Sequence, residues 1–216
     1  MSATETLNFD FAKLSSRDRY KLLIGIVVPR PIALITSVDE EGRVNAAPFS
    51  FFNVFSEEPA QIVLGLQRKA DGGLKDTTRN LRPLQHFVVN MVDEGLAATM
   101  NDCAMDFPPN VSEVEALGIE LRDGVHGPVP WMAASPIALE CKASVSIAFS
   151  PSRELLIGEV LGVIARPGLV DPSTLYVDAE AYRPIGRLAG NMYSRQGELF
   201  ELKRLTYDQW EGRKRS

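Results

Sequence analysis

The sequence predicts a mainly β domain whose antiparallel strands form a closed or nearly closed barrel with peripheral helices. Three observations support this fold class. The 216 residues are 45% hydrophobic and 24% charged, as in a single globular domain. Several segments rich in β-branched residues are separated by short turns. Helical stretches are too few for the crossovers of a parallel sheet, and closure of the sheet would remove exposed strand edges.

The first half of the chain is expected to hold two short helices among four strands. A capping box at Ser15–Asp18 begins the first helix, and residues 27–29 end it at a proline. Asp76–Thr78 supply N-cap side chains for the second helix. The expected strands cover 32–38, a run from 43 that continues through 45–54, 61–66 and 86–92, and the second helix covers 76–84.

The second half is expected to begin with helical turns and to continue as a long hairpin. Helical turns are predicted over 95–105 and over 112–115, where Ser112 and Glu115 form a second capping box. Two long strands, 135–149 and 154–165, are joined by a turn at 150–152. The remaining expectations are a weakly helical stretch over 171–181, an irregular glycine-containing segment to 197 and a short strand over 199–205.

Composition and charge exclude several functional classes. A formal net charge of −5 argues against nucleic acid as a partner. The longest apolar run, 22–28, is far shorter than the ~20 residues of a membrane-spanning helix. The N-terminus lacks the pattern of a secretory signal, so a cytoplasmic location is expected. Cys103 and Cys141 show no ligand spacing, so no metal site is expected and both are interpreted as buried small hydrophobes.

Common catalytic motifs are absent from the sequence. No Gly-x-Gly-x-x-Gly follows the first strand, and no Walker loop, Gly-x-Ser-x-Gly or His-Glu-x-x-His is present. The usual dinucleotide, nucleoside-triphosphate, hydrolase and zinc-protease interpretations therefore lose their support.

Three segments are candidates for ligand binding, and each has a purely structural alternative. Residues 45–54 combine small and polar residues with three phenylalanines, which suits a flat aromatic ligand or an aromatic core strand bent at Pro48. Residues 75–80 place cations and hydroxyls at a helix start, which suits a phosphate or a capped surface helix. Residues 187–193 suit either a binding loop or a plain connection with a glycine turn.

These segments, together with Pro29–Ser37 before them, resemble the flavin reductase-like family of FMN-binding split barrels. The resemblance extends from about residue 20 to 205 and rests most on 48–53 and on the turn at 75–77. It implies a six-stranded antiparallel Greek-key split barrel with peripheral helices, usually a homodimer with flavin near the subunit interface. The chain 1–216 would then be one domain, with 1–19 and 206–216 as terminal extensions.

The resemblance also implies which residues bind the cofactor. Ser50, Lys75 and Thr77, with Asp76 in the same turn, match the phosphate-binding positions. The flavin ring would lie along Thr36, Ser37, Ala47, Pro48, Phe49, Ser50, Phe51, Phe52 and Asn53. Arg187, Asn191 and Tyr193 match the late binding loop of the family.

Two positions depart from the family pattern. Shorter members carry a histidine where this chain has Arg153, so nicotinamide binding through a histidine does not transfer to this chain. Arg153 is either a contact for a dinucleotide phosphate or a solvated turn residue. Ala189 replaces a glycine of the late loop, which makes close backbone approach there less assured.

The function expected from the resemblance is an FMN-dependent oxidoreductase, with FAD possible as the flavin. It would take hydride from NAD(P)H onto flavin N5 and pass electrons to free flavin, a partner monooxygenase or another acceptor. His126, in a loop, and Tyr193 are the candidate protein groups near the ring, whereas His86 is interpreted as structural. One alternative is an electron carrier that a protein partner, and not nicotinamide, reduces. Another is a barrel that binds a different small metabolite or only assembles with partners.

Overall fold

The structure is a computed structural model, and it describes residues 6–69, 72–108 and 111–214. Its centre is one antiparallel sheet of seven strands in the order β2-β1-β5-β8-β9-β4-β3. The strands are β1 (Ala33–Val38), β2 (Val44–Phe49), β3 (Phe52–Glu57), β4 (Ala60–Gln67), β5 (His86–Met91), β8 (Ile137–Ser150) and β9 (Arg153–Ala165). The mainly β, antiparallel fold class is confirmed.

The sheet curls because its two end strands follow each other in the chain. Only Ser50 and Phe51 separate β2 from β3, so Phe49 and Phe52 lie within about 11 Å of each other. We expected one continuous strand over 45–54, and this bend divides it. The bend is fixed where the Gly65 N–H donates to the Phe51 carbonyl oxygen at 2.7 Å. The main sheet therefore has seven strands, where six were expected.

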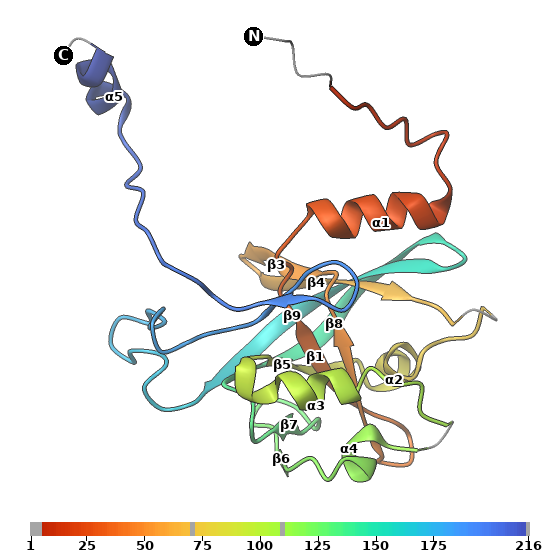
Figure 1. Cartoon of the computed structure of the whole chain (residues 1–216). Helices are drawn as coiled ribbons and strands as arrows, with labels where there is room; N and C mark the ends of the chain where they lie inside the picture. Colours follow the sequence, from red (N-terminus) through yellow and green to blue (C-terminus); the bar gives the residue numbers. More distant parts are fainter. Residues whose placement is uncertain (1–5, 70–71, 109–110, 215–216) are drawn as a thin grey trace.

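The helices and two small ribbons surround this barrel (Figure 1). Helix α1 (Ser16–Ile26) lies over one side, and α2 (Asp76–Leu84) lies beside the sheet. The remaining elements are η1 (Glu94–Leu96), α3 (Ala97–Asp102), α4 (Glu113–Ala116), α5 (Tyr207–Lys214), the ribbon β6 (Leu121–Arg122) with β7 (Trp131–Met132), and the ribbon β10 (Gly186–Arg187) with β11 (Tyr193–Ser194). The segment that leads to α5 runs away from the barrel (Figure 1).

Hydrophobic residues fill both faces of the central strands. On β1, Ala33 and Ile35 pack into the barrel interior with Phe87 and Leu64. Leu34 packs on the opposite face, under α3 and the loops around it. A strand buried on both faces explains why residues 32–38 form a nearly continuous apolar run.

Several local expectations are wrong. Residues 171–181 form no helix, because the side chains of Asp171 and Asp178 accept hydrogen bonds from nearby N–H groups and stabilise turns. Residues 199–205 form no strand and extend away from the barrel (Figure 1), and α5 was not expected. The N-cap of α2 is Lys75, whose side chain makes no capping bond.

The two expected capping boxes are confirmed at their N-cap residues. Ser15 Oγ accepts from the Asp18 N–H at 3.1 Å, and Ser112 Oγ accepts from the Glu115 N–H at 3.3 Å. None of the helices in the described ranges has the length and apolar character that crossing a membrane requires.

Candidate functional site

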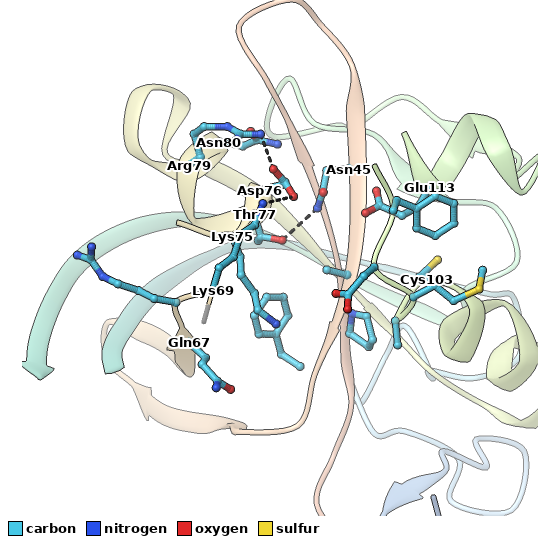
Figure 2. Close-up of a pocket in the computed structure, with 18 of the residues that line it drawn as sticks. Asn45, Gln67, Lys69, Lys75, Asp76, Thr77, Arg79, Asn80, Cys103 and Glu113 are labelled. Atoms are coloured by element: carbon cyan, nitrogen blue, oxygen red, sulfur yellow. Dashed lines mark hydrogen bonds and ion pairs between the residues drawn. The ribbon is translucent and has the colours of Figure 1, made fainter. Parts of the chain in front are cut away.

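A cavity of about 840 Å³ opens where β2, the start of α2, the end of the β4–β9 pair and the loop before α4 meet. Figure 2 shows polar side chains of α2 on one side of it, Asn45 between, and Cys103 and Glu113 opposite. The volume lies within the range of about 300–1,000 Å³ that is usual for small-molecule sites.

The start of α2 provides an open anion site on the cavity wall. The Arg79 N–H is the first in the helix to find an intrahelical acceptor, the Lys75 carbonyl oxygen, so the N–H groups of Asp76, Thr77 and Thr78 have none. Lys75 is exposed, and within the described ranges its ammonium has no hydrogen bond or ion pair. A helix N-terminus with free N–H groups and an adjacent cation attracts an anion such as phosphate.

Thr77 lies at the same helix start and is held in place by a side chain of β2. It is only 1% exposed, and its Oγ1 accepts a hydrogen bond from Asn45 Nδ2 at 3.0 Å (Figure 2). Because Asn45 occupies a lone pair of that oxygen, the hydroxyl proton of Thr77 remains available to a ligand acceptor. Asn45 comes from β2 and so connects the helix start to the barrel wall.

The cavity has a cationic side and an acidic side. Arg43 is paired with Asp39 at 2.7 Å, and Asp76 is paired with Arg79 and, at 3.6 Å, with Lys69. In the described part of the chain, the other three cations that line the cavity have no carboxylate partner: Arg68, Lys75 and Arg153. The unpaired positive charge therefore lies along the α2 and β4–β9 side.

Glu113 and Cys103 form the opposite wall. Glu113 is 8% exposed, and its Oε2 accepts from the Ala46 N–H of β2 at 3.1 Å. Burial raises the pKa of this carboxyl group, and the nearby charge of Asp76 acts in the same direction. Burial also raises the pKa of the Cys103 thiol to about 12, so the thiol stays protonated near neutral pH. Cys103 and Cys141 are both free and buried, as expected.

Phe51 forms an aromatic part of the wall at the bend between β2 and β3. Its ring centroid lies 6.3 Å from that of Tyr20 of α1, and the Arg153 guanidinium carbon lies 5.9 Å from it. The side chain rests on Gly65, where an added Cβ would come within 2.8 Å of Phe51 Cβ. Glycine at 65 is thus required for the ring to occupy this place.

Some of the residues assigned from the sequence line this cavity together, and others do not. Thr36 donates to the Pro130 carbonyl oxygen at 2.7 Å, and Ser37 accepts from Asn80 at 3.2 Å, so both support the wall from behind. The residues that line it are Ala47, Pro48, Phe49, Ser50, Phe51, Lys75, Asp76 and Thr77. Phe52 and Asn53 line a second cavity of about 290 Å³ beside α1, which Ser50 and Phe51 also line.

The late loop lies outside both cavities. Arg187 stacks on Tyr193 at 4.6 Å, bonds to its hydroxyl group and donates to the Gly190 carbonyl oxygen. Tyr193 in turn reaches Asn101 at 3.4 Å, whereas Asn191 is exposed. In this structure Arg187, Asn191 and Tyr193 therefore do not join the residues of the larger cavity.

His126 also lies away from the cavity. Its ring rests on Gly162 of β9, where an added Cβ would come within 2.1 Å of His126 Cδ2. The loop is held by Glu140, whose Oε1 accepts from the N–H groups of Val125 and His126 at 2.7 and 2.9 Å. The histidine packs on the outside of the sheet instead of facing the candidate site.

Sequence reasoning assigned no role to Arg30, which the structure makes a central link. Arg30 is 7% exposed and donates to the carbonyl oxygens of Ile24, Val27 and Leu188 at 2.6, 3.0 and 3.0 Å. Its Nε also lies 3.4 Å from Ser50 Oγ. The only sequence signal for this role was the Pro-Arg-Pro motif itself. Arginine is rarely buried unless its donors are paired, so its burial could not be expected from its residue type.

Further lining residues were missed because they are distant in sequence from the recognised motifs. Asn45 was noticed only as the start of an aromatic segment, although it shares the strand period of Ala47. Gln67 ends β4, Arg68 follows it directly, and Glu113 begins α4. No local pattern predicts that the start of α4 covers β2.

Comparisons with known proteins identify the family of the chain. A family model described as "Flavin reductase like domain" matches residues 26–186. An uncharacterized protein of Halalkalibacterium halodurans is 42% identical over 201 residues, which cover 91% of this chain and 95% of that protein.

Two solved structures are similar in both sequence and fold. The 2-nitrobenzoate 2-nitroreductase NbaA of Pseudomonas fluorescens has a TM-score of 0.86 at 38% identity, with 93% of this chain and 98% of that chain covered. Component B of nitrilotriacetate monooxygenase from Bacillus cereus has a TM-score of 0.88 at 36% identity, with 93% and 100% covered. The match over most of the chain, on a split barrel with this cavity, makes the protein a member of the flavin reductase-like family.

Proposed function

We propose that the protein is a flavin-dependent oxidoreductase that binds FMN in the 840 Å³ cavity. The observation that carries this proposal is that an open anion site and an aromatic wall share one cavity. Lys75 and the first-turn N–H groups of α2, which have no acceptor within the helix, suit a phosphate, and the wall from Ala47 to Phe51 suits a flat ring. FMN combines the same two chemical parts.

The chain's own residues fit the phosphate at named atoms. Lys75 Nζ and the first-turn N–H groups of α2 would donate to phosphate oxygens, and the Thr77 hydroxyl would add a third kind of donor. Ser50 Oγ faces Arg30 Nε at 3.4 Å, so its proton is also available to an acceptor. FAD would present a phosphate to the same site, and it is the alternative flavin.

The bound flavin would supply the hydride acceptor, and the protein would supply position and electrostatics. Phe51, Phe49 and Pro48 would limit the access of water to a flavin ring bound against this wall. The Cys103 thiol, with its pKa of about 12, stays protonated and so does not compete as a nucleophile. No protein acid or base is needed for a hydride transfer, provided that donor and acceptor are held close together.

We propose NAD(P)H as the electron donor and free flavin or a partner monooxygenase as the acceptor. The similarity to a monooxygenase component B supports a partner of that class. The similarity to a 2-nitrobenzoate 2-nitroreductase adds a nitroaromatic compound as a candidate acceptor. Arg153, which stands where shorter family members carry histidine, favours a second candidate function, an electron carrier that a protein partner reduces.

The proposal includes a homodimer. Exposed apolar side chains on α1, β3 and the segment before α5 support it, because a monomer rarely exposes so many. Examples are Ile26, Val54, Phe55 and Phe200.

The test is flavin binding followed by anaerobic reduction. The purified protein is expected to show a flavin absorption spectrum, or to acquire one on titration with FMN. NADH or NADPH should then bleach the flavin band under anaerobic conditions. Protein that fails to bind FMN or FAD would overturn the proposal, and slow bleaching by NAD(P)H with fast reduction by dithionite would favour the electron carrier.

A further inference from the structure

A second cationic group lines the same cavity at the end of the β4–β9 pair. Gln67 of β4 stands opposite Arg153 of β9 in the sheet register, and the Arg68 N–H donates to the Ser152 carbonyl oxygen at 3.2 Å. Both arginines belong to the cavity lining. The sheet therefore holds their backbones next to each other, and this end of the sheet reaches the first turn of α2, where Lys69 Nζ lies 3.6 Å from Asp76 Oδ2.

The guanidinium of Arg153 is held by neutral contacts and has no carboxylate partner among the residues that the structure describes. Its Nη1 donates to Gln67 Oε1 at 3.2 Å, and its carbon lies 5.9 Å from the centre of the Phe51 ring. The neighbouring carboxylate, Glu154, is directed to Arg82 at 3.8 Å and to Ser146. Of the five N–H donors of an arginine, most of those on Arg153 remain unused within the described residues.

Arg68 adds a second partly buried charge without a carboxylate among the described residues. Its Nη1 lies 3.4 Å from the Gly72 carbonyl oxygen, a long and neutral contact. Two guanidinium groups near one sheet end suit the oxygens of a phosphate or a diphosphate, which arginine binds with paired N–H donors.

We infer that Arg153 and Arg68 bind the phosphate groups of an ADP moiety, the half of an adenine dinucleotide that carries no reacting ring. The inference rests on the proposed function, because it assigns a second ligand part to the same cavity. The ADP moiety has two sources, a nicotinamide dinucleotide or FAD, and both present the same diphosphate to the arginines.

The experiment measures ADP binding by calorimetry to the full-length protein, with and without FMN. The Arg153→Gln variant is expected to bind ADP about tenfold more weakly, the effect of losing one charge-assisted hydrogen bond. Arg153→Lys should recover part of the affinity, since it keeps the charge without the paired donors. Arg122→Gln is the matched control, because Arg122 lies on β6 outside the cavity lining and should leave ADP affinity unchanged.

FMN affinity of every variant is measured separately by flavin fluorescence, which keeps the two proposals distinguishable. Loss of ADP affinity in Arg153→Gln with FMN affinity kept supports the inference. Wild-type protein that binds no ADP, or an Arg153→Gln variant that binds ADP like wild type, overturns it and leaves flavin binding intact. Protein that binds ADP through Arg153 but binds no flavin overturns the proposed function alone.

Two further arms identify the source of the ADP moiety. If it belongs to the nicotinamide cosubstrate, Arg153→Gln should raise the KM for NADH and leave that for nicotinamide mononucleotide in its reduced form unchanged. If it belongs to FAD, the same variant should lower FAD affinity and leave FMN affinity unchanged. An Arg153→Gln variant that changes neither readout would contradict both sources and the inference with them.

Discussion

Lys75 stands at the first turn of α2 with an exposed ammonium group beside N–H groups that the helix does not use. A substitution of Lys75 should therefore weaken the binding of ligands that carry a phosphate more than the binding of ligands that do not. Thr77, behind it, is buried and tied to Asn45, so it is a poorer site for a clean substitution.

Lys75→Ala should weaken FMN binding by about tenfold and riboflavin binding by less than about twofold, because the lost contact is to the phosphate that riboflavin lacks. The measurement is quenching of flavin fluorescence on titration with each ligand. Lys142→Ala, an exposed lysine on β8 outside the cavity lining, serves as the control. Equal weakening of FMN and riboflavin would refute the phosphate assignment.

The sequence predicts a part of the candidate site residue by residue. Phe51, Lys75 and Thr77 were recognisable because each lies in a short segment with an unusual composition. The sequence could not show that Thr36 lies behind the cavity wall. A strand that is buried on both faces has no pattern that tells which face meets the cavity. Arg153 lines the cavity because β9 pairs with β4, and local sequence does not determine that pairing.

Side chains at the start of α4 form hydrogen bonds with the backbone of β2 along the edge that has no neighbouring strand. The Ser112 hydroxyl donates to the Val44 carbonyl oxygen at 2.5 Å, and Glu113 accepts from the Ala46 N–H at 3.1 Å. The next outward position on that edge, Pro48, has no N–H group to satisfy. At the scale of elements, these side chains of α4 satisfy polar groups of an edge that would otherwise be open to pairing.

The buried carboxyl of Glu113 makes this edge sensitive to pH. Its pKa in the folded protein is raised above the ordinary 4.5 by burial, so the neutral form stabilises the fold below that value and the contribution is lost as pH rises through the folded pKa. Glu113→Gln stays neutral and keeps an oxygen for the Ala46 N–H. Its stability relative to wild type should therefore increase as the pH rises from about 4.5 to about 8.

Urea unfolding of both proteins across that pH range checks this expectation. Glu115→Gln, an exposed neighbour on the same helix, provides the comparison for a change of charge alone. A stability difference that stays constant or shrinks with rising pH would show that Glu113 does not carry the expected penalty.

The predictable and unpredictable elements differ in what specifies them. The β1–β2 hairpin and the β8–β9 hairpin follow from apolar runs on either side of a turn. The division of 45–54 at Ser50 and Phe51 depends on the contact with Gly65, which lies on another strand. Residues 171–181 had the composition of a weak helix, but the Asp side chains at 171 and 178 favoured local turns.

The whole molecule has an apolar segment that its own barrel does not cover. In the segment that leads to α5, Phe200 is 82% exposed and Leu202 is 84% exposed. The segment extends away from the barrel (Figure 1). A second copy of the chain, with apolar residues of α1 and β3 also exposed, is the occupant that the proposed homodimer provides.

Replacing Phe200 and Leu202 together by Asp should weaken dimerisation by more than roughly a hundredfold, because each side chain is expected to contribute about 1.5–3 kcal/mol when buried and occurs twice in a dimer. Sedimentation analysis over a range of protein concentrations measures the effect. Glu201→Gln, between the two positions, is the control. Wild-type protein that sediments as a monomer at every concentration would remove the basis for this dimer.

Among the described residues, the hydrogen-bond acceptors of Arg30 are all uncharged: the carbonyl oxygens of Ile24, Val27 and Leu188 and the hydroxyl of Ser50. Neither a peptide oxygen nor a guanidinium changes its ionic state in mild acid. The hydrogen bonds by which Arg30 connects α1 to the late loop should therefore persist in mild acid. Carboxylate pairs such as Arg43 with Asp39 weaken once the carboxylate is protonated. As the pH is lowered, the contact between α1 and the late loop should therefore persist after the ion pairs at the cavity have weakened.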